Sequence, residues 1–319
     1  AFGYLEYPSL IRGGHNTYHI TVRPDDVKAQ CQHVDLLLAF NKETAIMHSQ
    51  ELSAEGAILY DGESFELKPE ELGKKVKLYS VPLMKFAKEA GTEKMINTAA
   101  MGAILALLDY DLAIFKDLIK EEFADKGEEI VKGNYQAAEA GYRYAKDNYA
   151  ATFAFKLEKI SASPKMFITG NDAVVIGAVK AGVKMLAAYP MTPATSIMQG
   201  LAALEEDYNI IVKHTEDEIA AMAMINGAVM AGVRAMTCTS GGGFALMNEA
   251  FGMAGMAEQP VVAVVSQRGV PATGLPTWTG QGDLRFVTHA APGDNPRIII
   301  APGDATESFY ETFNAFNLA

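Results

Sequence analysis

The sequence has very little cysteine: Cys31 and Cys238 are the only two in 319 residues, and neither belongs to a CxxC pair. Two thiolates cannot hold an ordinary four-cysteine iron–sulfur cluster, and they exclude a disulfide framework. Four histidines fall within the first 50 residues, but their spacing matches no compact zinc-ligand pattern. We therefore expect no metal site in this chain.

The sequence also lacks an excess of basic residues, since 27 Lys and Arg stand against 39 Asp and Glu, for a formal net charge of −12. Nucleic-acid binders concentrate Lys and Arg, so nucleic acid is not an expected partner. No apolar run approaches the roughly 20 residues that a bilayer-spanning helix needs. The start, AFGYLEYPSL, lacks the basic and apolar regions of a secretory signal. We expect a cytoplasmic protein without a membrane partner.

The chain is long enough for two domains, and its hydrophobic fraction of 49% can fill two cores. Helical periodicity stops within AATFAFKLEKISASPKMFITG, where Ser, Pro and Gly gather. We place the boundary near Ser163, which gives domains 1–162 and 163–319.

The first segment begins with a strand–helix–strand pattern. Residues 35–40 and 56–62 are short apolar runs that predict buried strands, with NKETAIMHSQ as a helix between them. From Met84 to about Tyr149 the pattern is helical, so this segment predicts an α/β domain with a helical second half.

The second segment alternates strands and helices more regularly. The expected strands are KMLAAY, NIIV, RAMTCT, VVAVV and RIIIA, and the expected helices begin near Asp172, Pro193, Glu216, Gly243 and Asp304. This alternation favours a parallel sheet that helices cover on both faces. The helix over 216–231 is apolar nearly all round, which predicts burial against that sheet or against a partner.

In such a sheet, ligands collect at the carboxyl ends of the strands, so the loops there are the places to search. The loop YPMTP ends with Thr192 and Pro193, which suit the cap and the first position of a helix. Alternatively, the Thr192 hydroxyl and the amides of that helix start would hold a small anion.

The next loop leads into HTEDEIAA, where Thr215 and Glu218 have the spacing of a capping box. Three acidic residues in a first turn also suit the helix dipole. The functional alternative is that Glu218, at the start of an apolar helix, exchanges a proton with a ring nitrogen of a ligand.

Two glycine-containing loops follow. Gly241 to Gly243 form either a tight turn or a place of close ligand approach, without the Lys of a P-loop or GxGxxG spacing. The long loop SQRGVPATGLPTWTGQGDL begins with Arg268, which is either an ordinary solvated or ion-paired arginine or a clamp for a substrate carboxylate.

Taken in order, these loops resemble one protein family. From Met166 to Asp304 the phrases GNDAVVIGAVKAGVKMLAAYPMTPAT, EDEIAAMAMINGAVMAGVRAMTCTSGGGFALMNEAFGMAG and QRGVPATGLPT with GQGDL resemble the pyrimidine-binding domain of 2-oxoacid:ferredoxin oxidoreductases. EYPSLIRGGHNTYHITV resembles the loop of the family's gamma domain that contains Arg12. By this resemblance the gamma domain lacks its N-terminal strand and turn, and the alpha portion is truncated at its C-terminal end.

The resemblance implies a fold and a site. The fold is α/β, with a gamma-type α/β domain followed by a doubly wound parallel-sheet domain that binds the pyrimidine of thiamine diphosphate. Glu218 matches the catalytic carboxylate that bonds the aminopyrimidine. Thr192 and Arg268 match residues that hold the substrate carboxylate, while Tyr189 and Pro190 shape the wall near the cofactor.

The resemblance also implies partners. Thiamine diphosphate is shared with a beta subunit, on which Mg2+ and a 4Fe-4S cluster are expected; coenzyme A is the cosubstrate, and ferredoxin takes the electrons. The assembly is a dimer of gamma-alpha and beta pairs. The implied reaction is oxidative decarboxylation of a 2-oxoacid, with 2-oxoglutarate preferred because TGLPT resembles that branch.

The sequence departs from the family at two points, with SGGG where SGPG is common and QRGVPATG where QRGGPSTG is common. The second departure lies beside Arg268. Two alternatives stay open: a nonoxidative thiamine diphosphate enzyme, and a noncatalytic assembly subunit that uses helix 216–231 as an interface. An NAD dehydrogenase is disfavoured because the dinucleotide fingerprint is missing.

Overall fold

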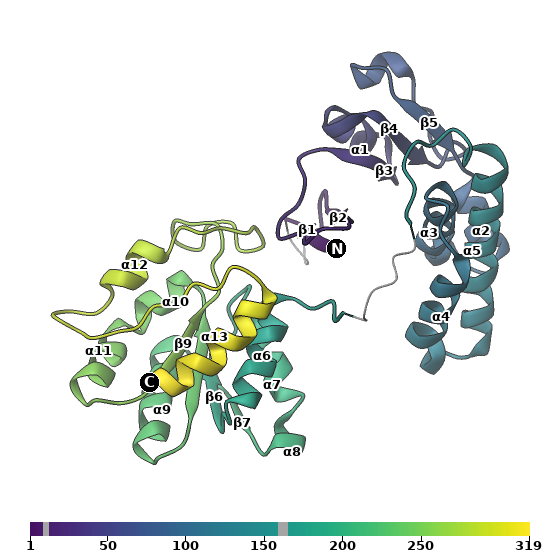
Figure 1. The fold of residues 1–319 in the computed structure, drawn as a ribbon. Helices are drawn as coiled ribbons and strands as arrows, with labels where there is room; N and C mark the ends of the chain where they lie inside the picture. Colours follow the sequence, from purple (N-terminus) through teal and green to yellow (C-terminus); the bar gives the residue numbers. More distant parts are fainter. Residues whose placement is uncertain (9–12, 159–164) are drawn as a thin grey trace. The chain divides into compact units, whose positions relative to one another are not determined.

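A computed structural model of the protein describes residues 1–8, 13–158 and 165–319. Its contacts divide the chain into two units, Ala1–Gln30 with Pro164–Ala319, and Cys31–Ser163 (Figure 1). Ser163, where the sequence suggests the boundary, and Arg12 of the expected gamma-domain loop both lie outside the described residues.

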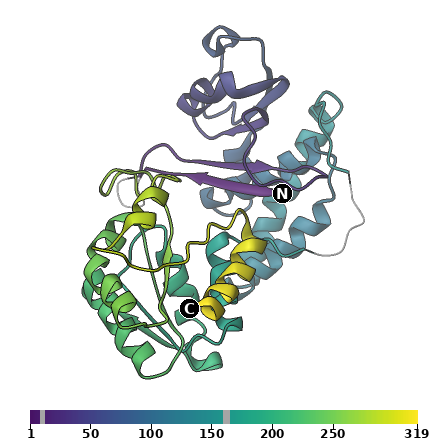
Figure 2. The ribbon, with the colours of Figure 1, turned by 60° about the vertical axis from the view of Figure 1, so that its left-hand side comes forward.

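The first 30 residues belong with the C-terminal unit, although the sequence placed them in a domain with residues 31–162. Strand β1 (Phe2–Glu6) pairs antiparallel with β2 (Thr17–Thr21) in a two-stranded sheet (Figure 2). The hydroxyl of Thr277 donates a hydrogen bond to the carbonyl of Tyr7. The ammonium of Lys28 lies 2.9 Å from the carboxylate of Asp304. These contacts tie the segment to residues far away in the sequence, which a local pattern does not reveal.

The unit of residues 31–163 contains a parallel sheet of order β3-β4-β5. Strand β3 (Val34–Ala39), helix α1 (Lys42–His48) and strand β4 (Leu52–Tyr60) confirm the predicted strand–helix–strand pattern. Strand β5 (Lys77–Ser80) was not predicted, because four residues with two polar ends carry little periodic signal. Ile58 and Leu59, which point to opposite faces of β4, are both fully buried.

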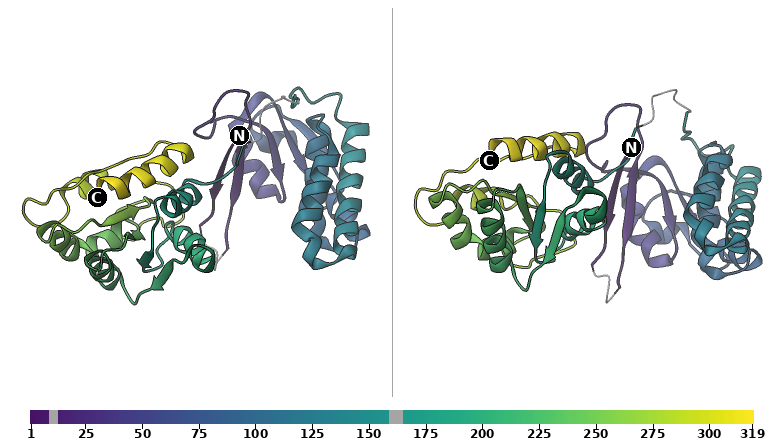
Figure 3. Two further views of the ribbon diagram at one scale, coloured as in Figure 1. Left: turned by 60° about the horizontal axis from the view of Figure 1, so that its bottom comes forward. Right: turned by 90° about the horizontal axis from the view of Figure 1, so that it is seen from below.

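The second half of this unit is helical, as predicted. Its helices are α2 (Leu83–Glu89), α3 (Ile96–Leu107), α4 (Leu112–Phe123) and α5 (Glu128–Asn148). Helices α3 and α5 lie side by side (Figure 3). A methyl group at Gly102 would stand 2.1 Å from the carbonyl oxygen of Ala138, and one at Gly141 would stand 2.0 Å from that of Ala99. The two glycines therefore let the helix backbones touch.

The unit that contains residues 165–319 is built on a parallel sheet of order β7-β6-β8-β9. The strands are β6 (Met185–Ala188), β7 (Ile211–His214), β8 (Ala235–Thr239) and β9 (Val262–Val265). The helices are α6 (Gly170–Lys180), α7 (Thr195–Ala202), α8 (Glu205–Tyr208), α9 (Glu218–Met230), α10 (Gly241–Leu246), α11 (Asn248–Met256), α12 (Leu284–His289) and α13 (Ala305–Leu318). Each of the first four predicted strands is confirmed.

Helices cover both faces of this sheet. One core joins α6, α7 and α13 to the side of the sheet that presents Met236 and Cys238. The other core joins α9, α10 and α12 to the side that presents Ala187 and Ala235. The arrangement confirms the expected α/β class with a doubly wound parallel sheet.

One expectation for this unit is wrong. The run RIIIA is not a strand, because it pairs with no strand in the described ranges and the side chain of Ile298 is exposed.

Helix α9, which the sequence predicted to be buried against the sheet or against a partner, buries one face within this chain and exposes another. Met222 and Ile225 face the sheet and are fully buried, whereas Ile219 is 51% exposed and Met230 is 75% exposed.

Across residues 1–8, 13–158 and 165–319, no helix combines the length and the apolar character needed to cross a membrane. In the same ranges, His, Cys, Asp and Glu side chains form no group of three or more that could hold a metal ion.

Candidate active site

The parallel strands β6 to β9 end at one edge of the sheet, so the loops that follow them share that edge. Two observations show that residues from different loops meet there. Arg268, after β9, donates a hydrogen bond to the backbone of Thr192, after β6. Glu218, after β7, lies against Gly243, which follows β8.

Glu218 is the first residue of α9 and is only 3% exposed. The cap of this helix is Asp217, whose side chain accepts a hydrogen bond of 2.7 Å from the N–H of Ala220. The Thr215 hydroxyl instead donates to the carbonyl of Asp217 at 2.8 Å. The expected capping box of Thr215 and Glu218 is therefore wrong, and the Glu218 carboxyl is not used to cap the helix.

The Glu218 carboxyl is buried with an unused acceptor. Its Oε1 atom has no hydrogen-bond partner in the structure. A methyl group at Gly243 would stand 2.8 Å from this oxygen and 2.1 Å from the hydroxyl oxygen of Thr239. The absence of a side chain at Gly243 thus leaves room for both groups, which is the role of a glycine at a close approach rather than at a strained turn.

Gly241 has a similar role two residues earlier. A methyl group there would stand 2.5 Å from both carboxylate oxygens of Asp283. The glycine-rich turn after β8 therefore accommodates two carboxyl groups, Glu218 at Gly243 and Asp283 at Gly241. The sequence left open whether this turn is only tight or admits close approach, and these distances favour close approach.

Arg268 is 5% exposed, which excludes the solvated arginine among the alternatives. Its Nη1 donates to the carbonyl oxygen of Thr192 at 2.8 Å, while its Nε has no partner. A methyl group at Gly280 would stand 2.5 Å from the carbonyl oxygen of Arg268, so the long loop folds back over this residue.

Thr192 does not cap a helix. Helix α7 begins at Thr195, and its N-cap residue, Ala194, makes no side-chain capping bond. The expectation of a cap at Thr192 followed by Pro193 in the first helical position is therefore wrong. The segment is an irregular turn, in which the backbone of Thr192 contacts Arg268.

Asp283 is a buried acid that the sequence reasoning missed. It is 6% exposed, its Oδ2 has no partner, and its backbone N–H donates to Oε1 of Gln267 at 2.9 Å. Burial raises the pKa of Asp283 above its ordinary value, and the positive charge of Arg268 offsets part of this rise. An acid within GQGDL, at the end of a long loop that begins with an arginine, was the available signal.

Tyr189 and Pro190 directly follow β6 at the same edge. The Tyr189 ring is partly exposed and lies edge-on to His214, the last residue of β7, with ring centroids 6.1 Å apart. Pro190 is also partly exposed. Both residues are thus available to line an opening at this edge.

Several buried polar atoms at this edge have no partner. They are Glu218 Oε1, Ser240 Oγ, Arg268 Nε and Asp283 Oδ2. An unsatisfied buried polar group costs about 1–3 kcal/mol, so such groups are rare unless a ligand or water meets them. Their accumulation at the carboxyl ends of the strands marks the candidate active site. The acceptor at Glu218 fits a donor such as the N–H of a heteroaromatic ring, and the guanidinium of Arg268 fits an anion.

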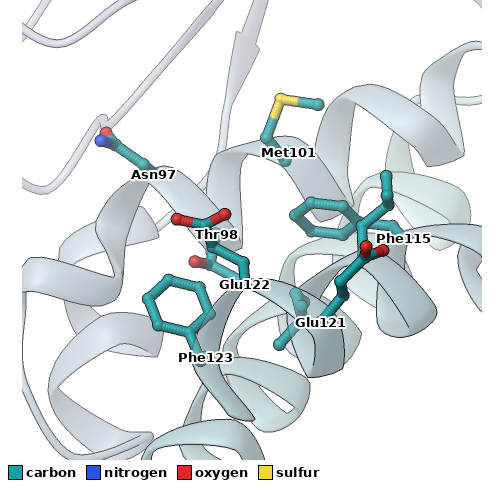
Figure 4. Close-up of a pocket in the computed structure, with 9 residues that line it drawn as sticks. Asn97, Thr98, Met101, Phe115, Glu121, Glu122 and Phe123 are labelled. Atoms are coloured by element: carbon teal, nitrogen blue, oxygen red, sulfur yellow. The ribbon is translucent and has the colours of Figure 1, made fainter. Parts of the chain in front are cut away.

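The chain also has a cavity elsewhere. A cavity of about 560 Å³ opens between α3 and α4 in the unit of residues 31–163 (Figure 4). Met101, Phe115 and Phe123 line it, with Glu121 and Glu122 beside them. Its lining offers neither a buried arginine nor a buried carboxyl, so we place the chemistry at the sheet edge.

Two family models match the chain. Residues 1–144 match the model described as pyruvate ferredoxin/flavodoxin oxidoreductase. Residues 176–319 match the model described as pyruvate flavodoxin/ferredoxin oxidoreductase, thiamine diphosphate-binding.

Individual relatives agree. The chain is 31% identical to the alpha subunit of a 2-oxoacid:ferredoxin oxidoreductase from Sulfolobus, in a match that covers 100% of this chain and 57% of that subunit. It is 46% identical to 2-oxoglutarate synthase subunit KorA from Methanothermobacter thermautotrophicus, over 48% of this chain and 41% of that subunit. The chain spans little more than half the length of its full-coverage relatives.

A solved structure is similar throughout. It is a 2-oxoglutarate:ferredoxin oxidoreductase from Magnetococcus marinus with 2-oxoglutarate, coenzyme A and succinyl-CoA bound. The TM-score is 0.90 at 33% identity, and the match covers 99% of this chain and 55% of that chain.

Proposed function

Because the chain belongs to the 2-oxoacid:ferredoxin oxidoreductase family, we propose that it is the fused gamma-alpha subunit of such an enzyme. The proposed reaction is coenzyme A-dependent oxidative decarboxylation of a 2-oxoacid in the cytoplasm, with electrons passed to ferredoxin. In this proposal residues 1–162 form the gamma domain and 163–319 the pyrimidine-binding domain. The observation that carries the proposal is the buried, unpartnered Oε1 of Glu218 at the edge of a doubly wound sheet.

The residues at this edge fit thiamine diphosphate. When bound, this cofactor supplies a carbon nucleophile and an electron sink, while the protein orients and tunes it. Glu218 would give a proton to the ring nitrogen of the aminopyrimidine, and its carboxylate would then accept a hydrogen bond from that protonated nitrogen. Because Gly243 has no side chain, the Glu218 carboxyl can lie close to the end of β8. Tyr189 and Pro190 would form the wall beside the ring.

Thr192 and Arg268 would hold the carboxylate of the 2-oxoacid. Arg268 is buried, and one of its amino groups is already fixed on the backbone of Thr192. A guanidinium held in this way loses little rotamer freedom when an anion arrives, so its hydrogen bonds are pre-organised.

A second polypeptide is part of the proposal. Burial raises the pKa of the Cys238 thiol to about 12, so this residue is an inert thiol. In this proposal the Mg2+ and the 4Fe-4S cluster lie on a beta subunit. The exposed apolar face of α9, which carries Ile219 and Met230, supports such a contact directly beside Glu218. We propose a dimer of gamma-alpha and beta pairs.

The proposed substrate is 2-oxoglutarate. Two findings support it: the 46% identity with the 2-oxoglutarate synthase subunit, and the similarity to a structure with 2-oxoglutarate and succinyl-CoA bound. A comparison of pyruvate and 2-oxoglutarate as substrates of the purified complex tests this choice.

The decisive experiment replaces Glu218 in the complex with the beta subunit. Glu218→Gln keeps the size of the side chain and removes the carboxylate, and we expect the coenzyme A-dependent reduction of a low-potential dye to fall roughly 10²- to 10⁴-fold. Glu216→Gln is the matched control, because Glu216 is exposed just before the same helix. Wild-type activity in Glu218→Gln would remove the catalytic assignment.

The same preparation separates the alternatives. Iron absorption in the purified complex supports an oxidoreductase over a nonoxidative thiamine diphosphate enzyme. Titration calorimetry with thiamine diphosphate distinguishes an enzyme from an assembly subunit, because a noncatalytic pair should not bind the cofactor.

A further inference from the structure

Asn171, the second residue of α6, connects three segments of the chain through one amide group. Its Nδ2 donates to the carbonyl oxygen of Pro193 and to the hydroxyl of Ser196, each at 2.9 Å. Its Oδ1 accepts from the hydroxyl of Ser266 at 3.3 Å. The carbonyl of Pro193 can only accept, so the amide nitrogen must face it and the amide oxygen must face Ser266.

The bonds of Asn171 and the contact between Thr192 and Arg268 join the same two segments of the chain. Pro193 is adjacent to Thr192, whose carbonyl accepts from Nη1 of Arg268 at 2.8 Å. Arg268 is two residues after Ser266, which donates to Asn171. The loop after β6 is therefore tied to the segment after β9 at two points, one of which is Asn171.

The ties matter because β6 and β9 are not neighbours. The sheet order is β7-β6-β8-β9, so β8 lies between them and no backbone pairing joins them. Hydrogen bonds of side chains therefore set the distance between Thr192 and Arg268 across the intervening strand β8. One of them uses the guanidinium of Arg268 itself, whereas the bonds of Asn171 leave that guanidinium free for an anion.

Asn171 has no part in starting its own helix. The N-cap of α6 is Thr169, whose hydroxyl accepts from the N–H of Asp172 at 3.1 Å, while the N–H of Thr169 donates to Asp172 Oδ2 at 2.9 Å. This capping box supplies the local stability of the helix end. The Asn171 side chain is therefore free to bond to Pro193 and Ser196 in the segment after β6.

We propose that Asn171 is a positioning residue that sets the spacing of Thr192 and Arg268 for the carboxylate of the substrate. This inference rests on the proposed function. Asn171 touches neither substrate nor cofactor; it acts by holding the turn at 193–196 against the end of β9. Removing its amide donor lets Thr192 move while Arg268 remains on its own loop.

The test uses Asn171→Asp in the complex with the beta subunit. Aspartate has the same shape and still accepts from Ser266, but it cannot donate to the carbonyl of Pro193. An added acid in the first turn suits the helix dipole, which offsets part of the stability lost with the hydrogen bond to Pro193. The loss of the bond to Pro193 frees the turn that follows Thr192, so KM for the 2-oxoacid should rise roughly tenfold or more, while KM for coenzyme A stays unchanged.

Asp172→Ala is the matched control. It breaks the capping box in the same helical turn, so it should lower the melting temperature. It leaves the bonds of Asn171 to Pro193 and Ser196 in place, so KM for the 2-oxoacid should stay within about twofold of the wild type. A wild-type KM in Asn171→Asp, with an active wild-type complex, would overturn the positioning role alone. A wild-type complex without activity on any 2-oxoacid would overturn the proposed function instead.

Discussion

Glu218 and Gly243 are in direct contact, and the contact depends on the missing side chain: a methyl group at Gly243 would stand 2.8 Å from Oε1 of Glu218. The same methyl group would stand 2.1 Å from Oγ1 of Thr239, which is fully buried on β8. Neither neighbour can withdraw into solvent, because the Glu218 carboxyl is itself buried. The position of the proposed catalytic carboxyl is therefore controlled by a glycine on another element.

Gly243→Ala should displace the Glu218 carboxyl and lower activity at least tenfold. The overlap should also lower the free energy of unfolding by about 1–3 kcal/mol, as overpacking of a core does. Gly242→Ala is the control, because no atom lies within 4 Å of a methyl group at that position. We expect it to keep full activity and to gain stability of about 0.5–1 kcal/mol, since alanine suits a helix better than glycine. Equal activities of the two variants in the dye assay would contradict the proposed contact.

The second prediction concerns Asp283. Burial raises its pKa in the folded chain above the ordinary value of 3.8, so the folded state binds this proton more tightly than the unfolded state. Its contribution to stability is full below pH 3.8 and is lost as the pH rises through the folded-state pKa. Asp283→Asn removes this titration.

The measurement is thermal unfolding of the wild type and Asp283→Asn between about pH 4 and pH 7. The melting temperature of the variant minus that of the wild type should increase with pH. The difference cancels the titration of the other groups, which both proteins share. If the difference in melting temperature stayed constant across this pH range, the pKa of Asp283 would not be raised in the folded chain.

The third prediction concerns the exposed apolar face of α9. A charge at Met230, which is 75% exposed, should leave the fold of this chain intact but weaken copurification with the beta subunit. Ile176→Asp is the control for Met230→Asp, because Ile176 is also exposed but lies on α6, across the sheet from α9. Unchanged recovery of the beta subunit with Met230→Asp would place the partner elsewhere.

The order of strands and helices could be predicted well because each buried strand is a short apolar run between helical stretches. KMLAAY and RAMTCT are such runs, and both form strands of the sheet. RIIIA is equally apolar but forms no strand, because pairing requires a neighbouring sheet edge, and a sequence run does not show whether one is available. The contacts of Tyr7 with Thr277 and of Lys28 with Asp304 were not predictable from local pattern either, because they join residues far apart in the sequence.

The candidate site was predictable as a set of loops but not in its details. The geometry brings Thr192 and Arg268 together and buries Glu218, whereas their chemical roles stay predictions. The predicted cap at Thr215 was wrong because the nearby Asp217 caps α9 instead. The predicted cap at Thr192 was wrong because α7 begins three residues after Thr192. Asn171 and Asp283 were missed because neither an amide in the first turn of a helix nor an acid at the end of a loop has a periodic signature. Their meaning comes from partners more than 15 residues away.

Glu218 opens the same helix whose outer side exposes its next residue, Ile219. A coenzyme that touches the first residue and a polypeptide that covers the second would bind within one helical turn of each other. Their affinities are then thermodynamically linked: whatever factor the coenzyme adds to subunit association, association must add to coenzyme affinity. Dilution of the complex should therefore release both together, and saturating coenzyme should hold the subunits together at concentrations where they would otherwise separate.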